Sequence, residues 1–195
     1  DTGAMYRAMG LYFLQNKIGM EETDKIDKAC SNIVISIEYK EGEQQIYLNG
    51  ENVTGFIRTE EVGKMASACA VNRQVRLKLV DLQRELAGRT DVIMDGRDIG
   101  TYVLPDADVK IYLTASSKER ARRRWTELSE KGISCDIDEI EKDIISRDRQ
   151  DENRDFAPLK QADDAVLVDS SYLTIEEVAD KIIKIFEEKI NSLKE

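Results

Sequence analysis

Asp91-Val92-Ile93-Met94, followed directly by Asp95-Gly96-Arg97-Asp98-Ile99-Gly100-Thr101, is the segment from which the architecture of this chain follows. An apolar run that ends at a charged turn is typical of a buried strand that brings polar groups to the end of a sheet. In open α/β folds, ligands bind at that end. The turn offers carboxylates, a guanidinium group and glycines, which suit an anion better than a core. We therefore expect phosphate chemistry at this position.

The residues after this segment alternate between strand-like and helix-like patterns. We expect strands at 108–113 and 165–169, and helices at about 117–131, 137–154 and 175–193. Capping boxes open the first and last of these helices, at Ser116-x-x-Glu119 and Thr174-x-x-Glu177. The last helix carries a stripe that we expect in the core, made of Ile175, Val178, Ile182, Phe186 and Ile190. Together with a strand at 91–94, this order predicts an α/β fold, a three-layer parallel sheet flanked by helices.

The residues before the segment predict a different local structure. Helices are expected from Thr2 to about Gln15 and over about 71–87. Between them, 33–39 and 45–48 are strand-like, and Asn49-Gly50 is a tight-turn dipeptide. Thr59, followed by two glutamates, is a good helix start. The pattern predicts a small antiparallel β insertion between helices.

Composition excludes several classes of protein. The 195 residues carry a formal net charge of −10, which argues against sequence-independent binding to nucleic acid. The chain contains no histidine, so a histidine-based catalytic triad is excluded. Cys30, Cys69 and Cys135 are too scattered for a zinc site, so no metal ligands are predicted, and they are typical of reduced thiols in a cytoplasmic protein. No apolar run is long enough to predict a membrane span.

Arginines nevertheless cluster on this acidic chain. Arg147, Asp151 and Arg154 are spaced to share one face of the helix predicted at 137–154. The helix before it carries Arg120, Arg123 and Arg124. Planar guanidinium groups match phosphate oxygens, so the pair of helices is a candidate phosphate-binding element. The alternative is a solvated helix pair held by internal ion pairs.

Four motifs then stand in order along the chain. They are Asp1-Thr2-Gly3-Ala4-Met5-Tyr6-Arg7, Ile57-Arg58-Thr59-Glu60-Glu61-Val62, the turn at 95–101, and Arg147-Asp148-Arg149-Gln150-Asp151-Glu152-Asn153-Arg154 with Ala157-Pro158-Leu159 after it. The first opens a helix, whose N-terminus favours an anion within reach of Arg7. In combination the motifs resemble the bacterial cytidylate kinase family, nucleoside-monophosphate kinases of the P-loop group. The resemblance covers essentially the whole chain.

The resemblance implies roles for individual residues. Thr2, Arg7, Arg97 and Arg154 would hold the acceptor phosphate, Asp151 and Arg147 would contact the sugar and phosphate region, and Ser67, Arg76 and Asp98 would read the base. Arg97, Arg147 and Arg154 would be catalytic, through charge neutralisation. From the residues alone, Ser67 is instead a small packing residue and Arg76 a solvated helix position. The family pattern also implies a single kinase domain over 1–195, with a monophosphate-binding insertion at 28–59 and a lid at 116–155 that carries Arg120, Arg123 and Arg124.

The implied reaction is transfer of the γ-phosphoryl group of ATP to CMP or dCMP, with Mg²⁺, in a monomer. One departure stands out, because the chain contains no G-x-x-x-x-G-K-[ST] motif, the P-loop that holds donor phosphates. We expect that segment to precede Asp1 in a longer protein, and the chain as given to be inactive as a fragment. Two alternatives remain: a non-catalytic pyrimidine-nucleotide-binding or regulatory homologue without a donor loop, and a related kinase with another acceptor such as UMP.

Overall fold

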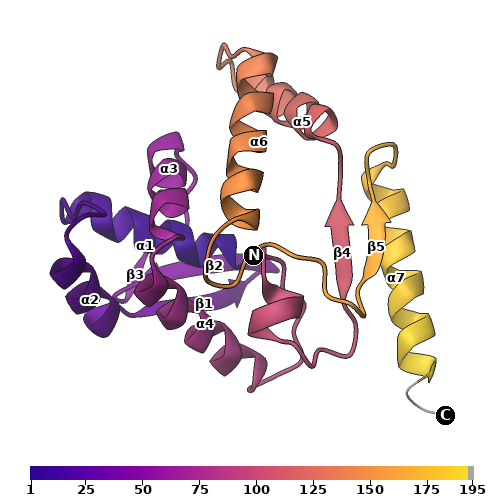
Figure 1. The fold of residues 1–195 in the computed structure, drawn as a ribbon, viewed down its shortest axis with the longest axis horizontal. Coiled ribbons are helices and arrows are strands. Elements are labelled where there is room, and N and C mark those ends of the chain that lie inside the picture. Colours follow the sequence, from indigo (N-terminus) through magenta and orange to yellow (C-terminus); the bar gives the residue numbers. More distant parts are fainter. Residues whose placement is uncertain (193–195) are drawn as a thin grey trace. The chain divides into compact units, whose positions relative to one another are not determined.

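The computed structural model describes residues 1–192, which form two compact units, 1–96 and from Arg97 onward. The first unit contains α1 (Gly3–Gln15), α2 (Thr23–Asn32), β1 (Ile35–Lys40), β2 (Glu43–Leu48), β3 (Glu51–Asn52), α3 (Glu60–Cys69) and α4 (Arg73–Ala87). The second contains η1 (Ile99–Val103), β4 (Ile111–Thr114), α5 (Ser117–Glu130), α6 (Ile137–Glu152), β5 (Val166–Asp169) and α7 (Ile175–Ser192). Helices flank small sheets in a mixed α/β fold (Figure 1).

The predicted antiparallel strands are confirmed. β1 pairs with β2, from Ile35 opposite Leu48 to Lys40 opposite Glu43, and β2 pairs with β3. Asn49 and Gly50 both have positive φ, at 51° and 86°, as a two-residue hairpin turn requires. The dipeptide therefore sets the register of the β2–β3 hairpin.

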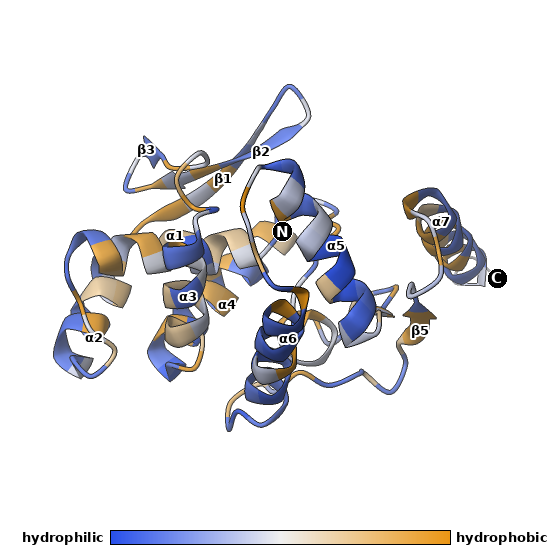
Figure 2. Ribbon diagram, turned by 90° about the horizontal axis from the view of Figure 1, so that it is seen from above, coloured by the Kyte–Doolittle hydropathy of each residue, from blue (hydrophilic) through white to orange (hydrophobic). Residues whose placement is uncertain are grey.

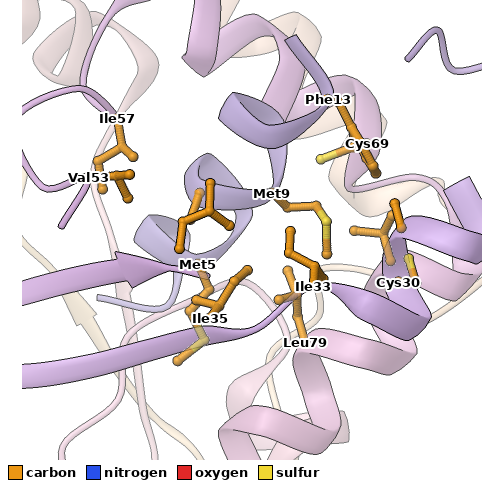
Figure 3. Packing of buried hydrophobic residues seen from close by; sticks show 14 of the residues in the cluster. Met5, Met9, Phe13, Cys30, Ile33, Ile35, Val53, Ile57, Cys69 and Leu79 are labelled. Carbon is orange, nitrogen blue, oxygen red and sulfur yellow. The ribbon is translucent and has the colours of Figure 1, made fainter. Parts of the chain in front are cut away.

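The core of the first unit forms around α1. Met5, Met9 and Phe13 are at most 1% exposed and pack with Ile35 and Leu79 (Figure 3). Gly10 allows α3 to approach closely, because a Cβ there would lie 2.9 Å from the backbone nitrogen of Ala66. This close approach fixes α3 against α1, and both helices carry predicted site residues.

The second unit is built on a parallel strand pair. β4 and β5 run side by side, from Ile111 opposite Val166 to Thr114 opposite Asp169 (Figure 1). The predicted helix starts are confirmed: Ser116 accepts from the backbone nitrogen of Glu119, and Thr174 and Glu177 cap each other reciprocally. α5 and α6 pack together as a hairpin.

Two predictions about this region are wrong. Residues 91–94 are not a strand, and Ile93 is 99% exposed. Among the described residues, β4 and β5 pair only with each other, so 91–94 has no ladder partner and stays irregular.

The stripe along α7 (Figure 2) is not a core either, since Ile175 and Phe186 are 85% and 52% exposed. A two-stranded sheet offers too little surface to cover it.

The three cysteines are free, as predicted, and burial raises the pKa of Cys69 to about 12. Within 1–192, no helix is both long and apolar enough to cross a membrane.

Candidate functional site

The first unit places Thr2 at the start of α1. Thr2 is 5% exposed, and its hydroxyl donates to the backbone oxygen of Asp95 at 2.6 Å. Its backbone nitrogen donates to the same oxygen at 3.2 Å. These bonds anchor the loop that precedes Arg97. A phosphate would have to compete with Asp95 for the hydroxyl hydrogen of Thr2.

The side chain of Arg7 extends from α1 to α3. Its Nη1 donates to the backbone oxygen of Ile57 at 3.3 Å. A Cβ on Gly63 would lie only 3.1 Å from that nitrogen, so the glycine leaves the space in which the guanidinium group lies. Ser67 is half-buried one turn further along α3, on the face that Gly63 shares. Arg7 and Ser67 therefore belong to neighbouring helix faces.

Arg76 is not the solvated helix position that its sequence context alone favours. The residue is 1% exposed, and its Nη1 donates to the backbone oxygen of Ala70 at 3.1 Å. Its Cζ lies 5.7 Å from the centre of the Tyr6 ring, within the range of a cation–π contact. A guanidinium group is costly to bury, so this arrangement marks Arg76 as a functional candidate. Tyr6 was missed as its partner, although it lies inside the first family motif.

In the second unit, Asp98 is the N-cap residue of the π-helical turn η1. The residue is 6% exposed, and its backbone oxygen accepts from the nitrogens of Tyr102 and Val103. Single π-helical turns are frequent at functional sites because they redirect side chains. The turn thus holds a buried carboxylate directly beside Arg97, whose side chain is 50% exposed.

Arg97 and Arg154 converge on one carboxylate. The Nε of Arg97 lies 3.2 Å from one oxygen of Asp151, and the Nη1 of Arg154 lies 3.0 Å from the other. α6 ends at Glu152, so Arg154 follows the helix and does not continue its face as the spacing predicted. Its Nε donates to the backbone oxygen of Ala157 at 2.8 Å, which holds the side chain close to Asp151 all the same.

A second carboxylate, Asp148, joins this group. Arg120 of α5 binds both of its oxygens, at 3.1 and 2.5 Å. Arg97 lies 4.0 Å from it. Asp148 was missed at the sequence level, where the one available signal was its position three residues before Asp151 on the same helix.

The other predicted lid arginines are engaged in different contacts. Arg123 donates to Glu119 and to the backbone oxygen of Ser170, at 2.8 and 2.6 Å. Arg124 pairs with Glu127 at 2.7 Å. Arg122, then Arg123, hold the pKa of Glu119 at about 2, and Lys131 and Arg124 do the same for Glu127. For Arg124 the structure fits the alternative of a solvated helix with internal ion pairs.

Arg147 is exposed and forms no ion pair within residues 1–192. It is therefore not one of the arginines that form ion pairs with Asp148 or Asp151.

In the part of the chain that the structure describes, neither a metal-ligand group nor the cavity between α2 and α4 coincides with these residues. Within 1–192, no three His, Cys, Asp or Glu side chains are grouped so that they could hold a metal ion. A cavity of about 430 Å³ lies between α2 and α4, lined by residues such as Cys30, Gln74 and Lys78. None of the predicted site residues lines it, so we identify the site from its charged groups and not from this cavity.

Comparison with known proteins gives a consistent result. A family model described as Cytidylate kinase matches residues 1–188. A cytidylate kinase from Caldicellulosiruptor bescii is 48% identical over 95% of this chain and 82% of its own length. One from Lactobacillus johnsonii is 48% identical over 97% of the chain and 82% of its own length, and one from Geobacillus sp. is 45% identical over 97% and 85%. With its arginine motifs in place, the chain belongs to the cytidylate kinase family.

Proposed function

We propose that the protein transfers the γ-phosphoryl group of ATP to CMP or dCMP, forming ADP and the pyrimidine nucleoside diphosphate. The observation that carries this function is the family match over residues 1–188. The grouping of Arg97, Arg120 and Arg154 around two carboxylates supports it, because phosphoryl transfer depends mainly on positioning and charge stabilisation. The acceptor oxygen of a nucleoside monophosphate is already anionic. The reaction therefore needs no histidine base and no covalent intermediate.

On the acceptor side, we assign the phosphate to Thr2, Arg7, Arg97 and Arg154, and the sugar to Asp151. Arg97 and Arg154 both form ion pairs with Asp151, so their guanidinium groups lie close together. A phosphate could replace the carboxylate as their shared partner. Arg7 is held by its hydrogen bond to the backbone oxygen of Ile57, in the turn that precedes α3. Fixed guanidinium groups of this kind lose little entropy when they bind an anion.

Base recognition is assigned to Ser67, Arg76 and Asp98. Cytosine offers an amino donor at N4, which needs an acceptor such as the carboxylate of Asp98 or the hydroxyl of Ser67. Its N3 and O2 need a donor, which Arg76 supplies. Uracil reverses the polarity at positions 3 and 4, so buried groups would lose their partners. Sites built to hydrogen-bond a substrate reject such analogues by factors up to about 10⁴.

The donor side rests on the basic helix α5, while Arg147 is assigned, with Asp151, to the sugar and phosphate region. Arg120, Arg123 and Arg124 lie on α5, and we assign them, with residues 116–155, to a lid that closes over the phosphates of ATP and excludes water. Mg²⁺ would bind through the phosphates of ATP, and no residue of this chain is assigned to it.

We also propose that the parallel sheet of this fold is wider than the β4–β5 pair. Leu113 and Leu167 are each 53% exposed on it, and Ile93 is 99% exposed in the preceding apolar segment. Parallel sheets are normally covered on both faces, so these side chains indicate a sheet with more strands and helices against it. The finer description as a three-layer sheet, with an insertion at 28–59, follows from the family.

The test is a coupled kinase assay on the protein expressed from its complete gene, with CMP, dCMP, UMP and AMP as acceptors. We expect turnover of CMP and dCMP, and weak use of UMP and AMP. CMP binding without turnover would support a regulatory homologue instead. Equal use of UMP would contradict the roles given to Asp98 and Arg76.

A variant separates phosphate handling from base reading. Arg154→Ala should lower turnover with every acceptor, because the phosphate is common to all of them. Lys160→Ala, an exposed position close by, serves as the control. Unchanged turnover in Arg154→Ala would remove the arginine from the catalytic machinery.

A further inference from the structure

Among residues 1–192, Asp148 is the carboxylate that joins α5 and α6 through a two-point ion pair. Both of its oxygens accept from Arg120, and its side chain is 20% exposed while that of Arg120 is 33% exposed. The hydrogen bonding that Arg120 donates to Asp148 is the main reason why the pKa of Arg120 lies above its usual value. A bidentate pair of this kind fixes the guanidinium plane as well as its distance.

The same carboxylate also lies near Arg97. One oxygen of Asp148 is 4.0 Å from Arg97, which is bound more closely by Asp151 at 3.2 Å. Arg97 thus lies between two carboxylates from one face of α6. A phosphate that binds Arg97 is therefore repelled by the negative charge of Asp148.

We propose that Asp148 is a positioning residue of the phosphotransferase: it orients Arg120 for the transfer step, and its charge competes with bound phosphate for the nearby arginines. This inference rests on the proposed function and assigns Asp148 a role that the family motif does not. It has two separable consequences, since orientation acts on turnover while competition acts on affinity.

The two consequences have opposite signs when the charge is removed. In Asp148→Asn one amide oxygen still accepts from Arg120, but the bidentate pair and the negative charge are lost. Turnover should fall about tenfold or more, because small misplacements of catalytic groups are costly. Affinity for CMP should rise about two- to fivefold, the range for partly exposed charge pairs. A residue that merely supports the fold would lower both.

Three further variants make the test specific. Asp143→Asn is the control, since it makes the same chemical change at an exposed position on the same helix. Asp148→Glu keeps the charge but shifts the carboxylate, so turnover should fall without any gain in affinity. If Asp148 acts through Arg120, adding Asp148→Asn to Arg120→Gln should lower turnover little further.

The measurements are kcat with saturating ATP and CMP, CMP affinity by calorimetry, and thermal unfolding, all on the protein from its complete gene. Lower kcat with tighter CMP binding in Asp148→Asn, at an unchanged unfolding temperature, supports the proposal. Behaviour equal to Asp143→Asn, weaker CMP binding, or full additivity with Arg120→Gln overturns it. A wild-type protein that fails to phosphorylate CMP overturns the proposed function itself, which is a different result from an active enzyme indifferent to Asp148.

Discussion

Individual residues in this chain are informative where their chemistry conflicts with their surroundings. Arg76 is 1% exposed and Asp98 is 6% exposed, although arginine and aspartate are seldom fully buried unless they are paired. Sequence context alone favoured a solvated position for Arg76, since nothing local in α4 reveals that the side chain meets Tyr6 from another helix. Resemblance to a family singled out both residues before any packing was known.

At the residue scale we predict that Asp98→Asn impairs the use of CMP. The amide keeps the size of the side chain but replaces one acceptor oxygen by a donor, which would face the N4 amino group of cytosine in the proposed site. We expect kcat/KM for CMP to fall about 100-fold or more, with the fold intact. Steady-state kinetics and circular dichroism check this. Asp106→Asn, at an exposed position in the same region, is the control, and unchanged kinetics in Asp98→Asn would place base recognition elsewhere.

Helix starts and turns were predictable from the sequence where the residues that determine them are close together in the chain. Thr59, Ser116 and Thr174 cap helices as predicted, and Asn49-Gly50 turns the hairpin, because each depends on atoms a few residues away. The strand predicted at 91–94 is absent from the structure. A strand needs a hydrogen-bonded partner strand, and no local sequence pattern shows whether one is present. The site depends on contacts between residues that are distant in the sequence. Family resemblance, and no local pattern, linked Arg97 with Arg154 and Asp151, and these three side chains lie together in the structure. Asp148 was missed because its pairing with Arg120 joins two helices.

On α3, we predict that Gly63→Ala weakens CMP binding without destabilising the protein. Alanine in a helix is about 0.5–1 kcal/mol more favourable than glycine, but its Cβ would lie 3.1 Å from the guanidinium nitrogen of Arg7. The arginine should shift, so KM for CMP rises while the unfolding temperature stays the same or increases. Gly55→Ala introduces the same group where nothing lies within 4 Å, and its KM should not change. A Gly63→Ala protein with normal KM would show that Arg7 does not contact the acceptor.

On α5, we predict a contribution to stability that is lost in acid. The pKa of Glu119 is about 2, against an ordinary value of 4.5, because Arg122 and Arg123 bind its charged form. A lowered pKa in the folded state stabilises the protein above pH 4.5, and this contribution disappears as pH falls from 4.5 to about 2. In urea unfolding at stepped pH, Glu119→Gln should flatten this decline relative to the wild type. Glu130→Gln, at an exposed position on the same helix, should leave it unchanged, and parallel curves for Glu119→Gln and wild type would contradict the assignment.

At the scale of the whole molecule, apolar burial is unevenly divided between the two units. The buried hydrophobic cluster of α1, α2, α4 and the antiparallel sheet lies entirely within residues 1–96. In the second unit the buried hydrophobic residues are Val103, Ala115, Ala121 and Val168, while large side chains on β4, β5 and α7 are exposed. Because burial of apolar surface is the main favourable term in folding, the second unit has much less to hold it together. Charged contacts, such as the ion pair of Arg120 with Asp148, therefore contribute a larger share of the stability of the second unit.

This imbalance predicts how the chain opens. In hydrogen exchange on residues 1–195, amides of α1 should be the slowest to exchange, and those of α5, α6 and α7 should exchange through local opening at lower free energy. Leu79→Ala, a large-to-small change in the core of the first unit, should lower the free energy of unfolding by about 2–5 kcal/mol and speed exchange in α1.

A ligand that binds the folded state stabilises the region it contacts. Inorganic pyrophosphate should therefore slow exchange near Asp148–Arg154, where arginines gather, and leave α7 unaffected. Equal protection of α1 and α6 without ligand would mean that the ion pairs hold the second unit as firmly as a hydrophobic core holds the first.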